Sequence, residues 1–169
     1  VMAHSYSHIH SIPITVFRFF TVYGPWGRPD MALFKFTKAI LENRPIDVYN
    51  YGDMQRDFTY IEDLCHAILT LSTESPTKQN SNYQSAVAAF RTVNIGNGKP
   101  EMLMSFIKII ENKLGKKAKL NLMPIQPGDV PKTYAQNNEL YELTGYKPQT
   151  DIAEGIEKFV DWYLSYYHS

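Results

Sequence analysis

Two arginines are the residues of this sequence whose type and position point most clearly to chemistry. Arg28 and Arg56 each lie in a polar loop near a short apolar run that is expected to form a strand. A guanidinium presents a planar fork that pairs with two oxygens of a carboxylate or phosphate, which the ammonium group of lysine does not match. The pattern indicates local binding of an anion. Bracing of a surface loop is the alternative for each arginine.

Metal-dependent and nucleophilic chemistry find less support. His4 and His8 have a spacing that could bind zinc, but no carboxylate or cysteine is nearby to complete a site, so partly exposed helix residues are expected and no metal. Cys65 is the single cysteine and is expected to be a small buried hydrophobe in a helix. No Gly-x-Ser-x-Gly elbow occurs. Glu62 and Asp63 are adjacent on an expected helix, where neighbours point in different directions, so they do not form an acid/base dyad.

The charge balance excludes strong long-range attraction to polyanions. Lys plus Arg and Asp plus Glu number 17 each, giving a formal net charge of zero. Neither nucleic acid nor a membrane surface is therefore expected as a partner. No run approaches about 18 consecutive apolar residues, and the first residues do not resemble a signal peptide. A cytoplasmic protein is expected.

The elements that would position these residues alternate between strands and helices. Residues 14–20 are β-branched and aromatic, which predicts a strand covered on both faces in a parallel sheet. Two glycines and two prolines make 23–30 a loop. The periodicity then predicts helices over 31–43, 61–73, 102–114, 137–143 and 152–163, strands over 46–49, 92–95 and 119–123, and a polar loop over 50–57. This alternation implies an α/β fold of one domain or part of a larger one.

Four segments together resemble the UDP-glucuronate 4-epimerases of the extended short-chain dehydrogenase/reductase superfamily. They are Phe19–Ala32 (FFTVYGPWGRPDMA), Tyr51–Ile61 (YGDMQRDFTYI), Asn94-Ile95-Gly96 and Gln126–Val130 (QPGDV), in that order. The resemblance covers nearly the whole chain. It implies the carboxy-terminal, substrate-binding part of an extended Rossmann-type epimerase, with the amino-terminal nucleotide-binding half absent. Within a single region 1–169, residues 1–24 would be a remnant of the Rossmann part and 25–169 mainly the sugar-nucleotide-binding subdomain.

The reaction that the resemblance implies is isomerisation of UDP-glucuronate to UDP-galacturonate, for surface polysaccharide, by NAD-dependent oxidation and reduction at sugar carbon 4. The family's base is the tyrosine of a Tyr-x-x-x-Lys motif, which would fall just before Val1. Tyr6 is followed by His10 and not by lysine, so it is no substitute. The chain also lacks a Gly-x-Gly-x-x-Gly turn. No catalytic residue and little activity are expected from this chain alone.

Individual roles follow from the resemblance, position by position. Thr21 and Arg28 would hold the sugar carboxylate, and Arg56 would grip the diphosphate. Asp129 would lie near the ribose hydroxyls. The uracil-contacting strand would include Val48 and Tyr49, and the nicotinamide end of NAD would meet Phe20 and Tyr23.

Alternatives remain beside this interpretation. Another epimerase, a decarboxylase or a dehydratase of the superfamily would share most of these features, and a non-catalytic binding or scaffold fragment is a further possibility. The family implies a homodimer formed through the helix that contains residues 1–10. Gln136 stands where the family usually has aspartate, which affects a local turn or helix cap rather than catalysis.

Overall fold

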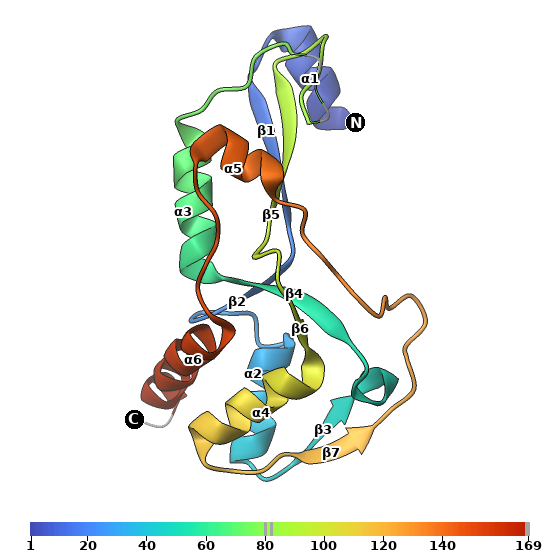
Figure 1. The fold of residues 1–169 in the computed structure, drawn as a ribbon, viewed down its shortest axis with the longest axis vertical. Helices are drawn as coiled ribbons and strands as arrows, with labels where there is room; N and C mark the ends of the chain where they lie inside the picture. The colour runs from blue at the N-terminus through green and yellow to red at the C-terminus, as the bar shows by residue number, and fades with distance from the viewer. Residues whose placement is uncertain (80, 82, 168–169) are drawn as a thin grey trace.

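The computed structural model describes residues 1–79, 81 and 83–167 as an elongated α/β arrangement (Figure 1). Elements at one end belong to one packed group, and elements at the other end to a second. The first group contains α1 (Met2–His10), β1 (Ile14–Phe19), α3 (Ile61–Ser72), β5 (Phe90–Ile95) and α5 (Asn138–Thr144). The second contains α2 (Ala32–Leu41), β3 (Pro45–Val48), the 3-10 turn η1 (Tyr49–Gly52), α4 (Leu103–Leu114), β7 (Lys119–Leu122) and α6 (Ile152–Tyr167). Between them lie β2 (Thr21–Tyr23), β4 (Gln55–Tyr60) and β6 (Pro100–Met102).

The first group is built on a parallel pair of strands, β1 and β5, in register from Ile14 opposite Phe90 to Phe19 opposite Ile95. Alternate residues of β5 are buried, and Val93 and Ile95 join a core with residues of α3 and α5. The parallel pairing agrees with the sequence prediction. The prediction that this first strand is covered on both faces is wrong, because its residues are half-buried or exposed and only β5 pairs with it among the described residues.

Arg91 is a buried cation that the sequence patterns did not single out. Its side chain lies on the buried face of β5 at 2% exposure. Nε donates to Thr15 Oγ1 at 2.9 Å, and Nη2 donates to the carbonyl of Leu71 in the last turn of α3 and to that of Glu74 just after the helix. Burial lowers the pKa of the guanidinium below its ordinary value. The hydrogen bonds offset the loss of hydration, so this arginine fastens α3 to the sheet.

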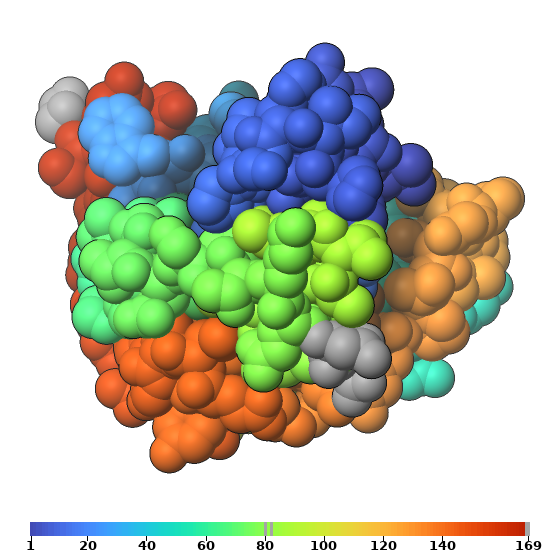
Figure 2. All heavy atoms as spheres, turned by 90° about the horizontal axis from the view of Figure 1, so that it is seen from above, coloured from blue at the N-terminus to red at the C-terminus, as the bar shows by residue number. Residues whose placement is uncertain are grey.

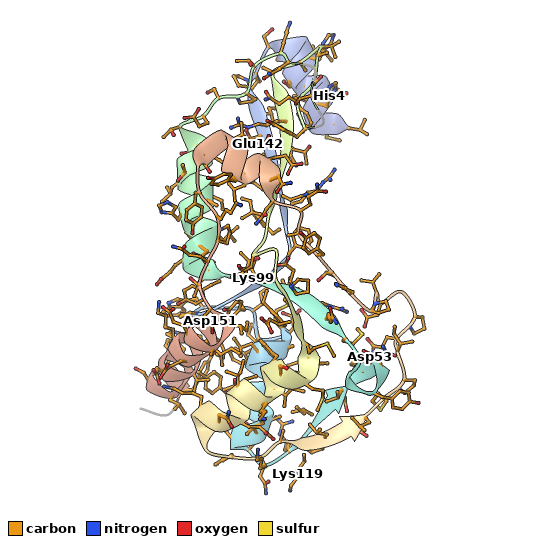
Figure 3. The ribbon with its side chains drawn as sticks, viewed as in Figure 1. His4, Asp53, Lys99, Lys119, Glu142 and Asp151 are labelled. Carbon is orange, nitrogen blue, oxygen red and sulfur yellow. The ribbon has the colours of Figure 1, made fainter. Side chains whose placement is uncertain are left out.

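Helix α1 lies against the chain that leads into β5, as the end-on view in Figure 2 shows. His8 Nδ1 donates to the Val87 carbonyl at 2.9 Å, and His4 Nε2 is 2.9 Å from Ser85 Oγ. Ser7, the buried residue of the helix, donates to the Ala89 carbonyl at 3.1 Å. The two histidines thus help to hold α1 against the segment that leads into β5. Figure 3 places His4 at the end of the molecule opposite Lys119 of β7.

The central strands join the two groups. β2 pairs in parallel with β4, Thr21 opposite Phe58, and β6 runs antiparallel to the start of β4, Gln55 opposite Met102. The prediction of a loop over 50–57 is therefore wrong for its last residues. Polar side chains predict a loop, but here Asp57 is buried and hydrogen-bonded inside the strand.

The second group packs three helices around an aromatic core. Phe58 of β4 stacks on Phe106 of α4 with ring centroids 4.4 Å apart, and Phe34 of α2 meets Tyr163 of α6 edge to face at 5.1 Å. The predicted helix over 102–114 is confirmed as Leu103–Leu114, and it ends at Gly115 in the left-handed conformation, φ 63°. Glycine adopts that conformation without steric cost, which is why it ends the helix.

Cys65 contradicts its prediction, because it is exposed. The buried residues of α3 are Asp63, Leu64, Ala67 and Leu71. Cys65 follows Leu64 directly, and successive helical residues point about 100° apart. Its side chain therefore falls outside the buried stripe.

Candidate functional site

The loop between β2 and α2, which carries Arg28, is fixed at several points. Gly24 has φ 141°, and a Cβ there would lie 2.5 Å from Ile61 Cγ2, so only glycine fits. Gly27 N–H donates to the Gly24 carbonyl at 3.1 Å, which closes a turn. The ring of Trp26 packs on that of Trp162 in α6, with centroids 5.3 Å apart. These contacts hold the backbone that leads into Arg28 close to α3 and α6.

The guanidinium of Arg28 is engaged by a carboxylate two residues along the chain. Nε donates to Asp30 Oδ1 at 3.0 Å and Nη2 to Oδ2 at 2.5 Å. This hydrogen-bonded pairing raises the pKa of Arg28 and lowers that of Asp30. Both side chains stay largely exposed, at 75% and 58%. The contact braces the loop, and it shows that this fork meets a carboxylate through two nitrogens.

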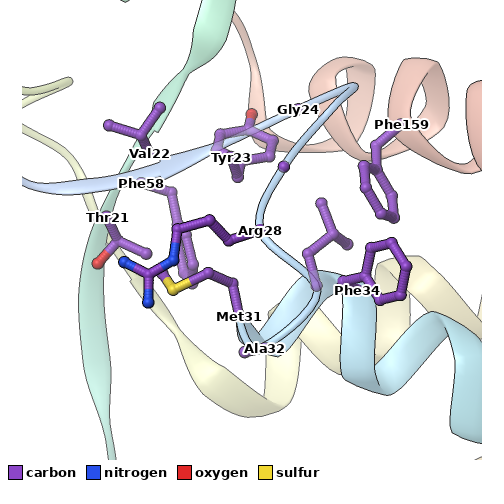
Figure 4. A pocket seen from close by; sticks show the side chains of 12 residues that line it. Thr21, Val22, Tyr23, Gly24, Arg28, Met31, Ala32, Phe34, Phe58 and Phe159 are labelled. Atoms are coloured by element: carbon purple, nitrogen blue, oxygen red, sulfur yellow. The ribbon is translucent and has the colours of Figure 1, made fainter.

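Thr21 and Arg28 both line the wall of a small cavity (Figure 4). The cavity has a volume of about 30 Å³, which suits one or two water molecules and not a sugar ring. Its other walls are aromatic and aliphatic side chains, including Phe34, Phe58 and Phe159. A ligand as large as a nucleotide sugar must therefore bind beside it.

A much larger groove, of about 800 Å³, adjoins this cavity at Thr21. Its volume is within the range of about 300–1,000 Å³ that is common for small-molecule sites. Three other predicted residues, Tyr49, Arg56 and Asp129, also line it. The groove has four basic side chains, three acidic ones and several aromatic ones; the charged residues are Lys35, Lys38, Arg44, Arg56, Asp30, Asp47 and Asp129.

Arg56 is positioned at the groove by the segment that follows β7. Nη1 donates to the carbonyls of Gln55 at 2.9 Å and Pro131 at 3.3 Å. Nη2 lies 3.9 Å from Asp129 Oδ1, a long ion pair that leaves donors of the guanidinium uncommitted. Arg56 and Asp129 are far apart in sequence and both line the groove.

The remaining predicted residues lie at different depths. Tyr49 is half-buried at the groove. Val48 is fully buried, so its side chain belongs to the core and does not reach the groove. Tyr23 is also a core residue, packed edge to face on Phe58 and Tyr60, and burial is the main cause of its raised pKa. Phe20 is half-buried beside Gly96.

Asp57 was missed by the sequence patterns, although it organises the site. Its fully buried carboxylate accepts hydrogen bonds from the backbone N–H groups of Asn97 at 2.9 Å, Gly98 at 3.0 Å and Ala135 at 2.8 Å. Its own N–H donates to Thr133 Oγ1 at 3.0 Å. Asp57 therefore fastens the segment after the Gln126–Asp129 turn beside Arg56. The available signal was an acidic residue next to the apolar run Phe58-Thr59-Tyr60.

Neither a cluster of metal ligands nor a membrane-spanning helix is found in the part of the chain that the structure describes. Among the described residues, no three histidine, cysteine or acidic side chains gather as metal ligands would. No helix in the described part of the chain is both long and apolar enough to cross a membrane.

The fold and these motifs define a family. The model of the NAD dependent epimerase/dehydratase family matches residues 1–96, and the chain belongs to that family. A probable UDP-glucuronate 4-epimerase of Rhizobium meliloti is 51% identical over 96% of this chain and 50% of its own length. The protein CapI of Staphylococcus aureus is 55% identical over 99% of this chain and 52% of its own.

A solved structure extends the likeness to the whole described arrangement. The UDP-glucuronic acid 4-epimerase of Bacillus cereus, crystallised with UDP-glucuronic acid and NAD, superposes with a TM-score of 0.84 at 32% identity. The match covers 98% of this chain and 50% of that one. The chain thus spans about half the length of the relatives it matches.

Proposed function

We propose that this chain is the carboxy-terminal, substrate-binding part of an NAD-dependent epimerase that interconverts UDP-glucuronate and UDP-galacturonate. The observation that carries the proposal is the meeting of Thr21, Arg56 and Asp129 in one groove, with the Arg28 fork beside Thr21. Such a groove offers separate positions for the acidic sugar and the diphosphate. Relatives named UDP-glucuronate 4-epimerase support the same substrate.

The chemistry of the groove fits an acidic nucleotide sugar. Arg28 already pairs bidentately with a carboxylate in this structure, and the sugar carboxylate would take the same fork. Arg56 has donors left for diphosphate oxygens, and the hydroxyls of ribose would bond to the carboxylate of Asp129. Aromatic side chains such as Phe34 and Phe58 also line the groove.

This chain would supply only some of the contacts to NAD. NAD would supply hydride acceptance and return at sugar carbon 4 when bound. Phe20, half-buried just after β1, is the predicted residue that would meet its nicotinamide end. Tyr23 lies in the core. We therefore assign this chain the binding and orientation of the sugar nucleotide, with the oxidation and reduction requiring groups beyond those described.

The division of the chain into residues 1–24 and 25–169 remains part of the proposal. In the structure, α3 and β5 come from the larger part and pack with β1 from the smaller. A Rossmann-like remnant would therefore include these elements as well as β1. Homodimer formation and a role in polysaccharide synthesis are proposed from the family resemblance.

Calorimetric binding of UDP-glucuronate and UDP-glucose to this chain tests the function. Loss of the bidentate contact in an Arg28→Ala variant should weaken UDP-glucuronate binding about ten- to a hundredfold, and should leave UDP-glucose binding nearly unchanged. Arg18→Ala is a matched control, because Arg18 is exposed on β1 and lines a different cavity with His4 and Tyr83.

Each outcome decides between interpretations. Preference for the acidic sugar that disappears in Arg28→Ala supports the proposal. Equal affinity for both sugars in the unaltered chain would favour a superfamily enzyme that acts on a neutral sugar. Binding of neither sugar would contradict a substrate-binding role for this chain by itself.

A further inference from the structure

Asp30 occupies one bidentate edge of the Arg28 guanidinium. Both carboxylate oxygens of Asp30 are bonded to Arg28, through Nε and Nη2, in the same two-point geometry that a hexuronate carboxylate would adopt. A guanidinium has five N–H donors, and its bidentate edges accept one carboxylate each. With Asp30 in place, the edge formed by Nε and Nη2 is closed to a second carboxylate.

The position of Asp30 allows it to leave without disturbing the fold. Its side chain is 58% exposed, and it is two residues from Arg28 in the same loop. Asp30 lines the large groove together with Thr21, whereas Arg28 lines the adjoining small cavity. The pair therefore spans the boundary between the two spaces. A rotation of the Asp30 side chain would open the fork toward Thr21 while the Gly24–Gly27 turn stays closed.

We propose that Asp30 is a specificity-determining residue that holds the Arg28 fork until a sugar carboxylate displaces it. This inference rests on the proposed function, because it assigns the sugar carboxylate to Arg28. An acidic sugar replaces one carboxylate by another, so the guanidinium keeps a charged partner. A neutral sugar offers only hydroxyls, which do not compete with Asp30 for the fork. Asp30 thereby lowers the affinity for the true substrate slightly and keeps a neutral sugar from using the fork.

The expected effect is modest, because exposed ion pairs are weak. Removing the competing charge in Asp30→Asn should tighten UDP-glucuronate binding by about two- to fivefold. UDP-glucose should gain as well, since its hydroxyls could now reach the guanidinium, and any gain must vanish when Arg28 is absent. A residue that merely positions Arg28 would have the opposite sign, because its loss would weaken binding of the acidic sugar.

The test is calorimetric titration of both nucleotide sugars into the full chain and four variants. They are Asp30→Asn, Arg28→Ala, the double variant and, as a control, Asp53→Asn. Asp53 is an exposed residue that follows η1 and does not line the groove. Thermal unfolding of each variant checks that the fold is kept. Tighter UDP-glucuronate binding in Asp30→Asn, absent from Asp53→Asn and from the Arg28→Ala background, is the expected result.

Other outcomes overturn the inference in distinguishable ways. Asp30→Asn could bind UDP-glucuronate as tightly as the unaltered chain, or more weakly, while Arg28→Ala still weakens UDP-glucuronate binding more than UDP-glucose binding. That result would reject displacement of Asp30 and leave the proposed function standing. Tighter binding that persists in the Arg28→Ala background would show a general charge effect of Asp30 and reject its action through the fork. Failure of every variant and of the unaltered chain to bind would reject the proposed function and this inference with it.

Discussion

The carboxylate of Asp57 accepts a hydrogen bond from the backbone N–H of Ala135 at 2.8 Å, across 78 residues of sequence. The same carboxylate binds the N–H groups of Asn97 and Gly98. One buried anion therefore ties β4 to two loops, and one of these loops continues from the groove residue Asp129. The shape of the groove depends on this contact as well as on the residues that line it.

Replacing Asp57 should cost more stability than any exposed carboxylate of the chain. In Asp57→Ala, the N–H groups of Asn97, Gly98 and Ala135 lose their carboxylate acceptor, and the free energy of unfolding should fall by more than about 3 kcal/mol. Urea denaturation measures the change. Asp53→Ala, on an exposed residue, should change it by less than about 0.5 kcal/mol. Similar small effects for the two variants would refute the structural role of Asp57.

Gly96 should not tolerate a methyl group, because the backbone there passes very close to Ala135. A Cβ at Gly96 would lie 2.2 Å from the Ala135 Cβ and 3.2 Å from Phe20 Cδ2. Gly96→Ala should therefore destabilise the fold by about 1–3 kcal/mol, the range for an overpacked core. Adding Ala135→Gly removes the closest contact. The double variant should lose less stability than the sum of the two single variants, and simple additivity would count against the close approach.

The sequence predicted the helices and the α/β class because each helix has an apolar stripe at the expected spacing. Leu103–Leu114 illustrates this, with Phe106, Ile107 and Ile110 buried and Gly115 at the end. Short polar strands were missed for the opposite reason. Gln55-Arg56-Asp57 has no apolar alternation, and its strand conformation depends on pairing with Pro100–Met102 and on distant backbone groups such as the N–H of Ala135. Local periodicity carries no information about such partners.

The candidate site was predicted in the same uneven way. Motif order identified Thr21, Arg28, Arg56 and Asp129, and the structure brings them to two adjoining spaces. No sequence pattern could show that Asp30 closes the Arg28 fork, since side-chain rotation decides that contact. The depth of Val48 and Tyr23 also follows from tertiary packing, which residue type alone does not determine.

Stability should decline at alkaline pH through Tyr146. Burial and the 2.7 Å hydrogen bond from its hydroxyl to Asp63 raise the pKa of Tyr146 above the usual value. A pKa that is higher in the folded state contributes stability that is fully present below about pH 10 and is lost as the pH rises through the raised pKa. Urea denaturation between pH 8 and 11 should show this loss.

The variant Tyr146→Phe should start less stable at pH 8, by about 1 kcal/mol, and decline less steeply. Burial also raises the pKa of Tyr23, so this residue accounts for part of the decline in stability that remains in the variant. Tyr134→Phe, on a side chain that is 58% exposed, is the control and should keep the full slope. An unchanged slope in Tyr146→Phe would assign the alkaline loss to other groups.

Arg56 and Arg28 should differ in which sugars they affect, because they would contact different parts of the ligand. Arg56 lies beside Asp129 in the large groove, where the proposed function places the diphosphate, a group common to UDP-glucuronate and UDP-glucose. Arg56→Ala should therefore weaken both by a similar factor, about ten- to a hundredfold for lost hydrogen bonds to a charged group. Arg28→Ala should weaken mainly the acidic sugar. Calorimetry at two salt concentrations measures the affinity of each of the two variants for each of the two sugars. The Arg18→Ala variant corrects for the general loss of one positive charge. If Arg56→Ala changed the ratio of the two affinities as strongly as Arg28→Ala does, the assignment of separate carboxylate and diphosphate positions would be wrong.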